Sequence, residues 1–250
     1  MFWSISVKER IDVLLVERGL LPSREKAQAY IMAGSVAVNG RSDIKAGTKV
    51  DKDAEIVLKE DPIPFVSRGG LKLKAALDEW EIDVEGAVCV DIGASTGGFT
   101  DLMLARGAAK VYAIDVGYGQ LDYSLRTDPR VVNMEKTNIR LLDTDGFPEK
   151  ADFICIDVSF ISLKLVLPVA ARLLKEASSC IVCLVKPQFE AARNQVGKGG
   201  IIKDPIIHAE VLDKVRGYAA ENGLAAVAEI ESPIRGTKGN TEYLMKVMAI

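Results

Sequence analysis

Histidine is almost absent from this sequence: among its 250 residues, His208 is the only one. Metal clusters and catalytic triads that depend on histidine are therefore excluded. No apolar run approaches the roughly 18 residues that a membrane span needs, and Met1–Ser6 is too short for a signal peptide. A basic excess is also lacking, because the net charge is -3 at pH 7. We expect a cytoplasmic protein in which any nucleic-acid partner meets a local basic patch.

Cysteine is scarce as well, and the four present are Cys89, Cys155, Cys180 and Cys183. Cys180 and Cys183 have the spacing of a Cys-x-x-Cys motif, but they lie in an apolar run that predicts a strand. Residues three apart on a strand point to opposite faces, which disfavours a redox pair or a shared metal ion. We therefore expect reduced cysteines in the core and no metal site.

The most informative stretch is Val88–Thr100, which reads Val-Cys-Val-Asp-Ile-Gly-Ala-Ser-Thr-Gly-Gly-Phe-Thr. Its first five residues predict a strand buried on both faces, residues 93–98 a glycine-rich turn, and residues 99–106 a helix. This order presents backbone N–H groups and a helix N-terminus to a nucleotide-like ligand. Asp115 ends the next predicted strand, where an acid is placed to accept both ribose hydroxyls of an adenosine.

Two details of this stretch favour S-adenosylmethionine as the cofactor. A dinucleotide fingerprint has its middle glycine where this chain has Ser95, and Asp91 precedes the loop. The pattern Asp-x-Gly-x-x-x-Gly-Gly suits S-adenosylmethionine, which has no phosphate but has an amino-acid end to hold. NAD binding and a glycine turn without a ligand are the alternatives. The loop residues that we expect at the cofactor are Gly93, Ser95, Thr96, Gly97, Gly98 and Phe99.

The chain divides into a small N-terminal module (residues 1–60), a proline-containing linker (61–66) and a larger domain (67–250). In the module, residues 9–18 and 24–33 predict helices, and short strands are expected at 36–38 and within 50–58, with a tight Asn39-Gly40 turn. In the larger domain, strands are expected at 88–92, 111–115, 131–134, 153–157, 181–186, 225–230 and 243–247. Helices are expected at 99–106, 120–126, 163–174 and 205–222. This alternation predicts an α/β, Rossmann-like sheet, and the last strand should run antiparallel because no helix precedes it.

The N-terminal module resembles the S4-type RNA-binding domain. The residues that carry this resemblance are Arg10-Ile11-Asp12, Glu17-Arg18-Gly19, Ser23-Arg24 and the run from Gly34 to Gly40. The resemblance implies a small α+β fold and places four basic residues on helices that face RNA phosphates, namely Arg10, Arg18, Arg24 and Lys26. The alternative is a solvated charged face without a partner.

Reactive groups of an open α/β sheet gather beyond the carboxyl ends of its strands, and Asp157 and Lys186 each end an apolar strand. Methylation of a base is disfavoured, because the segment from Asp157 to Phe160 lacks the two prolines of amino methyltransferases and no cysteine follows a proline. A hydroxyl acceptor remains, and a ribose 2′-hydroxyl needs a base that removes its proton.

A lysine that is crowded by a second cation can act as that base. The segment Ser67–Leu73 supplies a second lysine, and Glu242 precedes the last strand, at the same edge of the sheet if that strand is antiparallel. The alternative is a purely structural ion pair between Asp157 and Lys186.

Over almost all of its length the chain resembles the hemolysin A (TlyA-type) family, which joins an S4 domain to an FtsJ-like methyltransferase domain. The motifs concerned are residues 66–73, 91–100, 115–121, 157–163, 185–190 and 239–243. The resemblance implies S-adenosylmethionine-dependent 2′-O-methylation of ribosomal RNA, usually at cytidine, by a Lys-Asp-Lys-Glu tetrad. By motif, that tetrad is Lys72, Asp157, Lys186 and Glu242. The resemblance also places Gly97, Gly98, Phe99, Asp115 and Asn138 at the cofactor, and Asp157 is expected beside it from its position after a strand. The linker lacks the Arg-x-Trp-Val form of some members.

We expect ribosomal RNA or ribosomal subunits as the partner, a monomeric protein and no membrane partner. Besides the S4 module, the basic residues that should contact RNA are Arg68, Arg193, Lys198 and Arg235. Two functions of other classes remain as alternatives. One is a non-catalytic RNA-binding protein with a vestigial methyltransferase fold, and the other is a membrane-active hemolysin, which the family name suggests.

Overall fold

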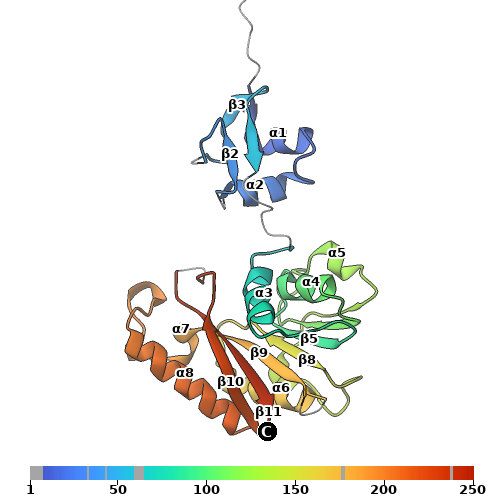
Figure 1. Ribbon diagram of the computed structural model, residues 1–250, viewed down its shortest axis with the longest axis vertical. Coiled ribbons are helices and arrows are strands. Elements are labelled where there is room, and N and C mark those ends of the chain that lie inside the picture. The colour runs from blue at the N-terminus through green and yellow to red at the C-terminus, as the bar shows by residue number, and fades with distance from the viewer. Residues whose placement is uncertain (1–7, 33, 43, 59–64, 176–177, 237–238) are drawn as a thin grey trace, which may run out of the picture. The chain divides into compact units, whose positions relative to one another are not determined.

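The chain forms two compact units, Met1–Pro64 and Phe65–Ile250 (Figure 1). The structure is a computed structural model that describes residues 8–32, 34–42, 44–58, 65–175, 178–236 and 239–250. Of the predicted linker, residues 61–66, only Phe65 and Val66 lie inside these ranges, so the linker stays a prediction. Phe65 is buried, and the backbone N–H of Val66 donates to Asp101 Oδ2 at 2.8 Å, so both belong to the second unit.

The N-terminal unit packs two helices against short strands. Its elements are β1 (Lys8–Arg10), α1 (Ile11–Glu17), α2 (Arg24–Met32), β2 (Val36–Val38), β3 (Lys49–Asp51) and β4 (Ile56–Leu58). β1 pairs with β3 and β2 pairs with β4, both antiparallel. Apolar residues of both helices and of β2, among them Ile11, Leu15, Tyr30 and Val36, form its core. The unit therefore has the predicted α+β fold.

Local details of this unit differ from the expectation. The first helix begins at Ile11 rather than Glu9, because Glu9 pairs with Val50 in a strand. The turn at Asn39 and Gly40 forms with both residues at positive φ, and Val38 bridges to Arg41 across it, but the strand that pairs along the length of β2 is β4. Tertiary pairing thus decides which strand becomes the neighbour of β2.

A seven-stranded sheet forms the centre of the C-terminal unit, in the order β10-β11-β9-β8-β5-β6-β7. The strands are β5 (Val88–Ile92), β6 (Lys110–Ile114), β7 (Val131–Met134), β8 (Phe153–Ile156), β9 (Cys180–Val185), β10 (Leu224–Glu231) and β11 (Tyr243–Ala249). The strands β5 to β9 are parallel, and β11 runs antiparallel to both of its neighbours, β9 and β10. The prediction of a Rossmann-like sheet with an antiparallel last strand is confirmed.

Helices cover both faces of this sheet (Figure 1). They are α3 (Gly69–Glu79), α4 (Gly98–Ala105), α5 (Tyr123–Arg126), α6 (Leu167–Leu173), α7 (Pro187–Glu190) and α8 (Pro205–Ala220). Val90 and Ile92 of β5 belong to the core that α6 and α8 complete. Asp91 alternates with them and bonds Thr100 of α4, so α4 lies on the opposite face, where it packs against β5, β6 and α3.

Three helices depart from the prediction. The helix expected at 163–174 is a 3-10 turn, Leu163–Leu165, followed by α6, whose second residue is Pro168; a proline fits the first turn because no N–H is needed there. The helix expected from residue 120 is shorter, because the side chain of Asp122 accepts the N–H of Ser124 and caps α5. Helix α3 is not predicted at all, since it begins at Gly69-Gly70.

Several predicted core residues lie where the sequence placed them. All four cysteines are buried, and burial raises the pKa of the Cys89 and Cys183 thiols to about 12. Within the described ranges, no helix combines the length and the apolar character that crossing a membrane requires.

Candidate active site

The glycine-rich loop follows β5 and occupies a conformation that side chains would block. Gly93 has φ +91°, and a Cβ there would overlap the carbonyl oxygen of Asp157. Gly97 has φ +97°, and a Cβ there would overlap the side chain of Leu125. The N–H of Gly93 donates to the carbonyl of Ile114 at 2.8 Å, which joins the loop to the end of β6. The loop backbone therefore lies against both neighbouring strands of the sheet.

Asp91 lies beneath this loop and is fully buried. Its Oδ2 accepts the backbone N–H of Thr100 at 3.0 Å and the Thr100 hydroxyl at 2.7 Å, whereas its Oδ1 is buried without a hydrogen-bond partner. Burial raises the pKa of Asp91 to about 7, although the hydrogen bonds from Thr100 oppose the shift. A buried carboxyl oxygen without a partner next to a cavity can accept a donor from a ligand.

Asp115 holds the loop from the other side. Its Oδ2 accepts the N–H of Ser95 at 2.8 Å and its Oδ1 accepts the N–H of Gly117 at 2.6 Å. Ser95 has φ +50°, so this hydrogen bond supports a backbone conformation that non-glycine residues seldom adopt. A carboxylate offers about four acceptor positions, and two of them remain for a ligand. Asn138 also has a local partner, since its Oδ1 accepts the N–H of Arg140 at 3.2 Å.

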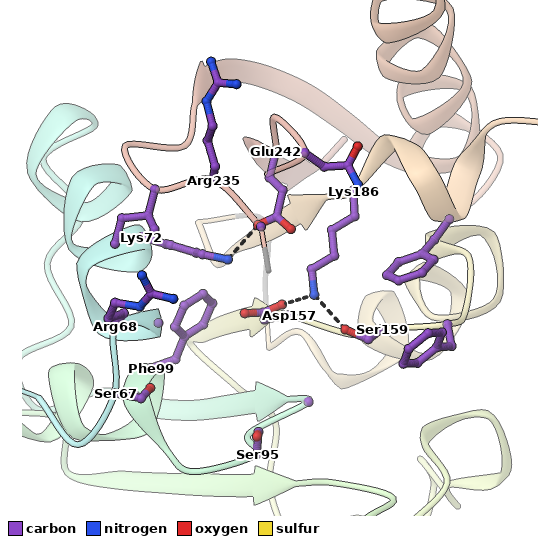
Figure 2. A pocket seen from close by; sticks show the side chains of 18 of the residues that line it. Ser67, Arg68, Lys72, Ser95, Phe99, Asp157, Ser159, Lys186, Arg235 and Glu242 are labelled. Atoms are coloured by element: carbon purple, nitrogen blue, oxygen red, sulfur yellow. Dashed lines mark hydrogen bonds and ion pairs between the residues drawn. The ribbon is translucent and has the colours of Figure 1, made fainter. Parts of the chain in front are cut away.

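The structure brings together the four side chains of the predicted tetrad, which form two ion pairs (Figure 2). Lys72 Nζ lies 2.6 Å from Glu242 Oε2, and Lys186 Nζ lies 2.6 Å from Asp157 Oδ1. The side chains of Lys72 and Lys186 are only 13% and 10% exposed. Each lysine is thus paired with its own carboxylate inside a largely desolvated site.

The sheet explains why these residues converge. Asp157 follows β8, and its N–H donates to the carbonyl of Ile92 at 2.9 Å. Lys186 follows β9, and because Tyr243 of the antiparallel β11 pairs with Val185, the preceding Glu242 lies beside Lys186. Lys72 comes from α3, which packs against β11. Without the reversed direction of β11, Glu242 would lie at the opposite edge of the sheet.

Gly236 closes the site over Glu242. A Cβ at Gly236 would overlap Glu242 Oε1, and the Glu242 side chain is only 3% exposed. Only a residue without a side chain fits this position while the carboxylate stays where Lys72 reaches it. Gly236 thus lies against the Glu242 carboxylate, which is almost fully removed from water.

One cavity of about 630 Å³ joins the glycine loop and the two ion pairs. All four tetrad residues line it. Of the other predicted cofactor residues, Gly93, Ser95, Thr96, Gly98 and Phe99 line it, whereas Gly97, Asp115 and Asn138 do not. Of the predicted RNA-binding residues, Arg68 and Arg235 line it, whereas Arg193 and Lys198 lie on exposed 3-10 turns, Arg193–Gln195 and Lys198–Gly200.

Several lining residues were not among the candidates from the sequence, and Ser159, Phe160, Gln188 and Phe189 are four of them. The Ser159 hydroxyl accepts a hydrogen bond from Lys186 Nζ at 3.0 Å. The rings of Phe160 and Phe189 lie 5.2 Å apart, and Phe160 is 91% exposed with φ +64°. The available signal was their position in the sequence, because they lie within three residues after Asp157 and Lys186, which themselves follow β8 and β9.

The comparisons with known proteins agree with this geometry. Residues 65–247 match the FtsJ-like methyltransferase family, and residues 9–56 match the S4 domain. The chain is 45% identical over 239 residues to TlyA of Mycobacterium tuberculosis, a 16S/23S rRNA (cytidine-2′-O)-methyltransferase, covering 95% of this chain and 89% of that one. The chain belongs to the TlyA-type family of FtsJ-like methyltransferases.

Two further members of the TlyA-type family show the same extent of likeness. Hemolysin A of Brachyspira hyodysenteriae is 43% identical over 236 residues, which cover 94% of this chain and 98% of that one. A solved structure of a hemolysin-like protein from Streptococcus thermophilus is 45% identical, with a TM-score of 0.76 over 98% of this chain and 90% of that one. The likeness therefore extends over both the S4 domain and the methyltransferase domain.

The residues of the methyltransferase domain fit S-adenosylmethionine, the cofactor of this enzyme class. Gly93 lets the loop backbone lie close against Asp157, and residues of this loop line the cavity. The unpartnered Asp91 Oδ1 and the two remaining acceptor positions of Asp115 are suited to the donor groups of an amino acid and a ribose. NAD is excluded as the cofactor that binds this loop, because residues 65–247 match a family of methyltransferases.

In the S4 domain, the predicted RNA-binding arginines contact other residues of the domain. The buried Asp12 accepts hydrogen bonds from Arg10 Nε at 2.9 Å and from Arg24 Nη2 at 3.1 Å, and these contacts hold the pKa of Asp12 well below its usual range. Arg18 donates to the carbonyl oxygens of Lys52 and Ala54. The side chains of Arg10 and Arg24 are still 43% and 51% exposed, so their outer N–H groups can reach a ligand.

Proposed function

We propose that this protein transfers a methyl group from S-adenosylmethionine to the 2′-hydroxyl of a cytidine in ribosomal RNA. The observation that carries the proposal is the shared cavity that both the two lysine–carboxylate pairs and the glycine loop line. The TlyA-type relative at 45% identity has this reaction in its name. A hydroxyl acceptor needs a base and an ordered approach to the methyl group, and this arrangement supplies groups for both.

In this proposal, Lys186 is the base. In its neutral form Nζ accepts the proton of the 2′-hydroxyl, and Asp157, 2.6 Å away, keeps the amine in place and stabilises the positive charge that forms. Lys72 and Glu242 form the second pair, whose Lys72 ammonium favours the negative charge that develops on the ribose oxygen. Because these groups are largely shielded from water, their mutual orientation persists without the ribose.

Cofactor binding is assigned to the loop residues that line the cavity together with Asp91 and Asp157. When bound, S-adenosylmethionine supplies a methyl group on a positively charged sulfur, which makes the methyl carbon the electrophile. Asp115, which bonds Ser95 of the loop, and Asn138 stay predicted contacts of the cofactor, since neither lines the cavity. Positioning within the cavity supplies most of the acceleration in this mechanism.

RNA contact is assigned to three groups of residues. Arg68 and Arg235 line the cavity and are placed to contact phosphates next to the target nucleotide, as arginine does in many RNA complexes. The exposed ring of Phe160, next to Phe189, is placed to stack on an unpaired base. The S4 domain, through Arg10, Arg24 and the other basic residues of its helices, adds affinity that depends on salt.

The proposed partner is a ribosomal subunit or its RNA, met by a monomer in the cytoplasm, where ribosomes are. The intact tetrad and glycine loop support an enzyme rather than a vestigial methyltransferase fold. The name hemolysin belongs to the relatives, and a liposome-leakage assay with the purified protein tests membrane activity directly.

The decisive experiment measures transfer of labelled methyl from S-adenosylmethionine to purified small and large ribosomal subunits that lack this modification. Nuclease digestion and mass spectrometry then locate the label. We expect a 2′-O-methylcytidine, and Lys186→Ala should abolish transfer while the dissociation constant of S-adenosylmethionine stays within about twofold. A methyl group on a base, or a fully active Lys186→Ala variant, would contradict the proposed mechanism.

A further inference from the structure

Lys186 has a second contact besides its carboxylate partner. Its Nζ donates to Ser159 Oγ at 3.0 Å and lies 2.6 Å from Asp157 Oδ1, and Figure 2 shows both side chains below the amine. Ser159 lies two residues beyond Asp157 in the segment after β8, and it lines the same cavity. This hydroxyl belongs neither to the tetrad nor to the glycine loop.

Because an amine nitrogen is tetrahedral, the contact with Ser159 affects where the lone pair of Lys186 points. A neutral lysine nitrogen has two N–H bonds and one lone pair, arranged with the Cε bond as a tetrahedron. If one N–H points to Asp157 and the other to Ser159, the remaining tetrahedral position holds the lone pair. With Asp157 as the sole partner, the amine can rotate about the Cε–Nζ bond, and the lone pair occupies two positions instead of one.

We propose that Ser159 is a positioning residue for Lys186, which fixes the lone pair of the neutral amine toward the 2′-hydroxyl of the target ribose. This inference rests on the proposed function, in which Lys186 is the base. The proton leaves the 2′-oxygen and bonds to Nζ, so that the neutral amine becomes an ammonium while Ser159 keeps its own proton. Ser159 thus acts through Lys186 and takes no part in the transfer of the methyl group.

The surrounding structure holds Ser159 in register with Lys186. Glu190 lies on α7, which begins directly after Lys186, and its Oε2 accepts the Ser162 hydroxyl at 2.5 Å. Glu190 Oε1 accepts the N–H of Leu163 at 2.7 Å, and Glu190 itself is buried. These two bonds tie the segment that follows Ser159 to the segment that follows Lys186. The buried bond from the backbone N–H of Leu163 does not need the Ser162 hydroxyl and keeps the two segments joined without it, although Ser159 is itself exposed.

Three variants separate positioning from a structural role. Ser159→Ala removes the hydroxyl, and Ser159→Thr keeps it on a residue of similar size. Ser162→Ala is the matched control, because it removes a hydroxyl three residues away on the same segment that does not contact Lys186. Single-turnover methyl transfer to the ribosomal subunit that the wild type modifies gives the rate of the chemical step, and calorimetric titration gives the dissociation constant of S-adenosylmethionine.

We expect Ser159→Ala to lower the single-turnover rate about tenfold, with the dissociation constant of S-adenosylmethionine and the KM for the subunit within about twofold of the wild type. Ser159→Thr should retain the rate within about threefold, and Ser162→Ala should lower the melting temperature without a comparable loss of rate. The proposal is overturned if Ser159→Ala keeps the wild-type rate, if Ser159→Thr is as slow as Ser159→Ala, or if either variant mainly weakens binding of the cofactor.

The activity of the wild-type protein distinguishes a failure of the proposed function from a failure of the role of Ser159. If the wild-type protein transfers no methyl group to either subunit, the proposed function fails before Ser159 is examined. If the wild type is active, Lys186→Ala is inactive and Ser159→Ala is unaffected, the function stands and the role of Ser159 is refuted.

Discussion

The buried carboxyl group of Asp91 should make the stability of the methyltransferase domain fall as the pH rises. Burial raises its pKa from 3.8 to about 7; hydrogen bonds from Thr100 oppose this shift and the charge of Asp157 adds to it. The folded protein therefore keeps a proton that the unfolded chain releases between about pH 4 and pH 7. The stability that this proton contributes is complete below the unfolded pKa and is lost as the pH rises through the folded pKa.

The variant Asp91→Asn isolates this effect, because a neutral amide resembles the protonated acid and can still accept from Thr100. Since one pKa unit corresponds to about 1.4 kcal/mol, a rise from 3.8 to about 7 changes the difference in unfolding free energy between wild type and variant by about 4 kcal/mol from pH 4 to pH 8. The wild type loses stability relative to the variant over this interval. If burying the amide of the Asp91→Asn variant costs a fixed amount of free energy, the difference in unfolding free energy shifts by that amount at every pH. Its slope against pH is unchanged.

The assay is urea unfolding at several pH values, followed by tryptophan fluorescence. The chain has two tryptophans, so a Trp3→Phe background lets Trp80, which follows α3, report on the methyltransferase domain. Asp152→Asn is the control, because hydrogen bonding to Val88 lowers the pKa of Asp152, and its contribution is lost only as the pH falls. Equal slopes for wild type and Asp91→Asn between pH 4 and pH 8 would refute a raised pKa of Asp91.

Three further changes test other parts of the structure. Gly236→Ala should displace the Glu242 carboxylate from Lys72 and lower the methyl-transfer rate about tenfold or more, and an unchanged rate would show that the carboxylate moves freely. Asp12→Ala should destabilise the S4 domain by about 2 kcal/mol, because it removes the buried partner of two arginines, and a thermal unfolding scan measures this. Arg235→Ala should weaken RNA binding and reduce its dependence on salt, measured as the slope of affinity against salt concentration; a slope equal to that of the wild type would exclude a phosphate contact.

Much of the site follows from local sequence patterns. A buried strand that runs into glycine and then into a helix is short-range information, and the loop forms with Gly93 and Gly97 at positive φ, as that pattern requires. The positions of Asp157 and Lys186 after apolar strands predict one shared edge, because parallel strands end on the same side of a sheet. The antiparallel direction of β11, which brings Glu242 to that edge, follows from the absence of a helix between the last two strands.

Other features depend on contacts between residues far apart in the chain. Helix α3 begins at Gly69-Gly70, a pair that predicts a turn, and its first turn packs so closely on the Phe65 ring and the Gly98 carbonyl that only glycine fits at position 70. The sequence alone predicts that the Asp115 carboxylate contacts a ribose. The fold adds that this carboxylate also accepts hydrogen bonds from the N–H groups of Ser95 and Gly117.

Contacts between distant residues also decide the partners of the basic side chains. Sequence motifs placed Arg10 and Arg24 on an RNA-facing surface, whereas folding brings both to the buried Asp12, because a carboxylate removed from water must be paired. Ser159 had no signal in the sequence beyond its place after Asp157. Its contact with Lys186 spans 27 residues and arises only where β8 and β9 lie side by side. Periodicity thus predicted the fold and the family resemblance predicted the tetrad, whereas the pairing of strands decided which hydroxyl and which carboxylates meet each basic group.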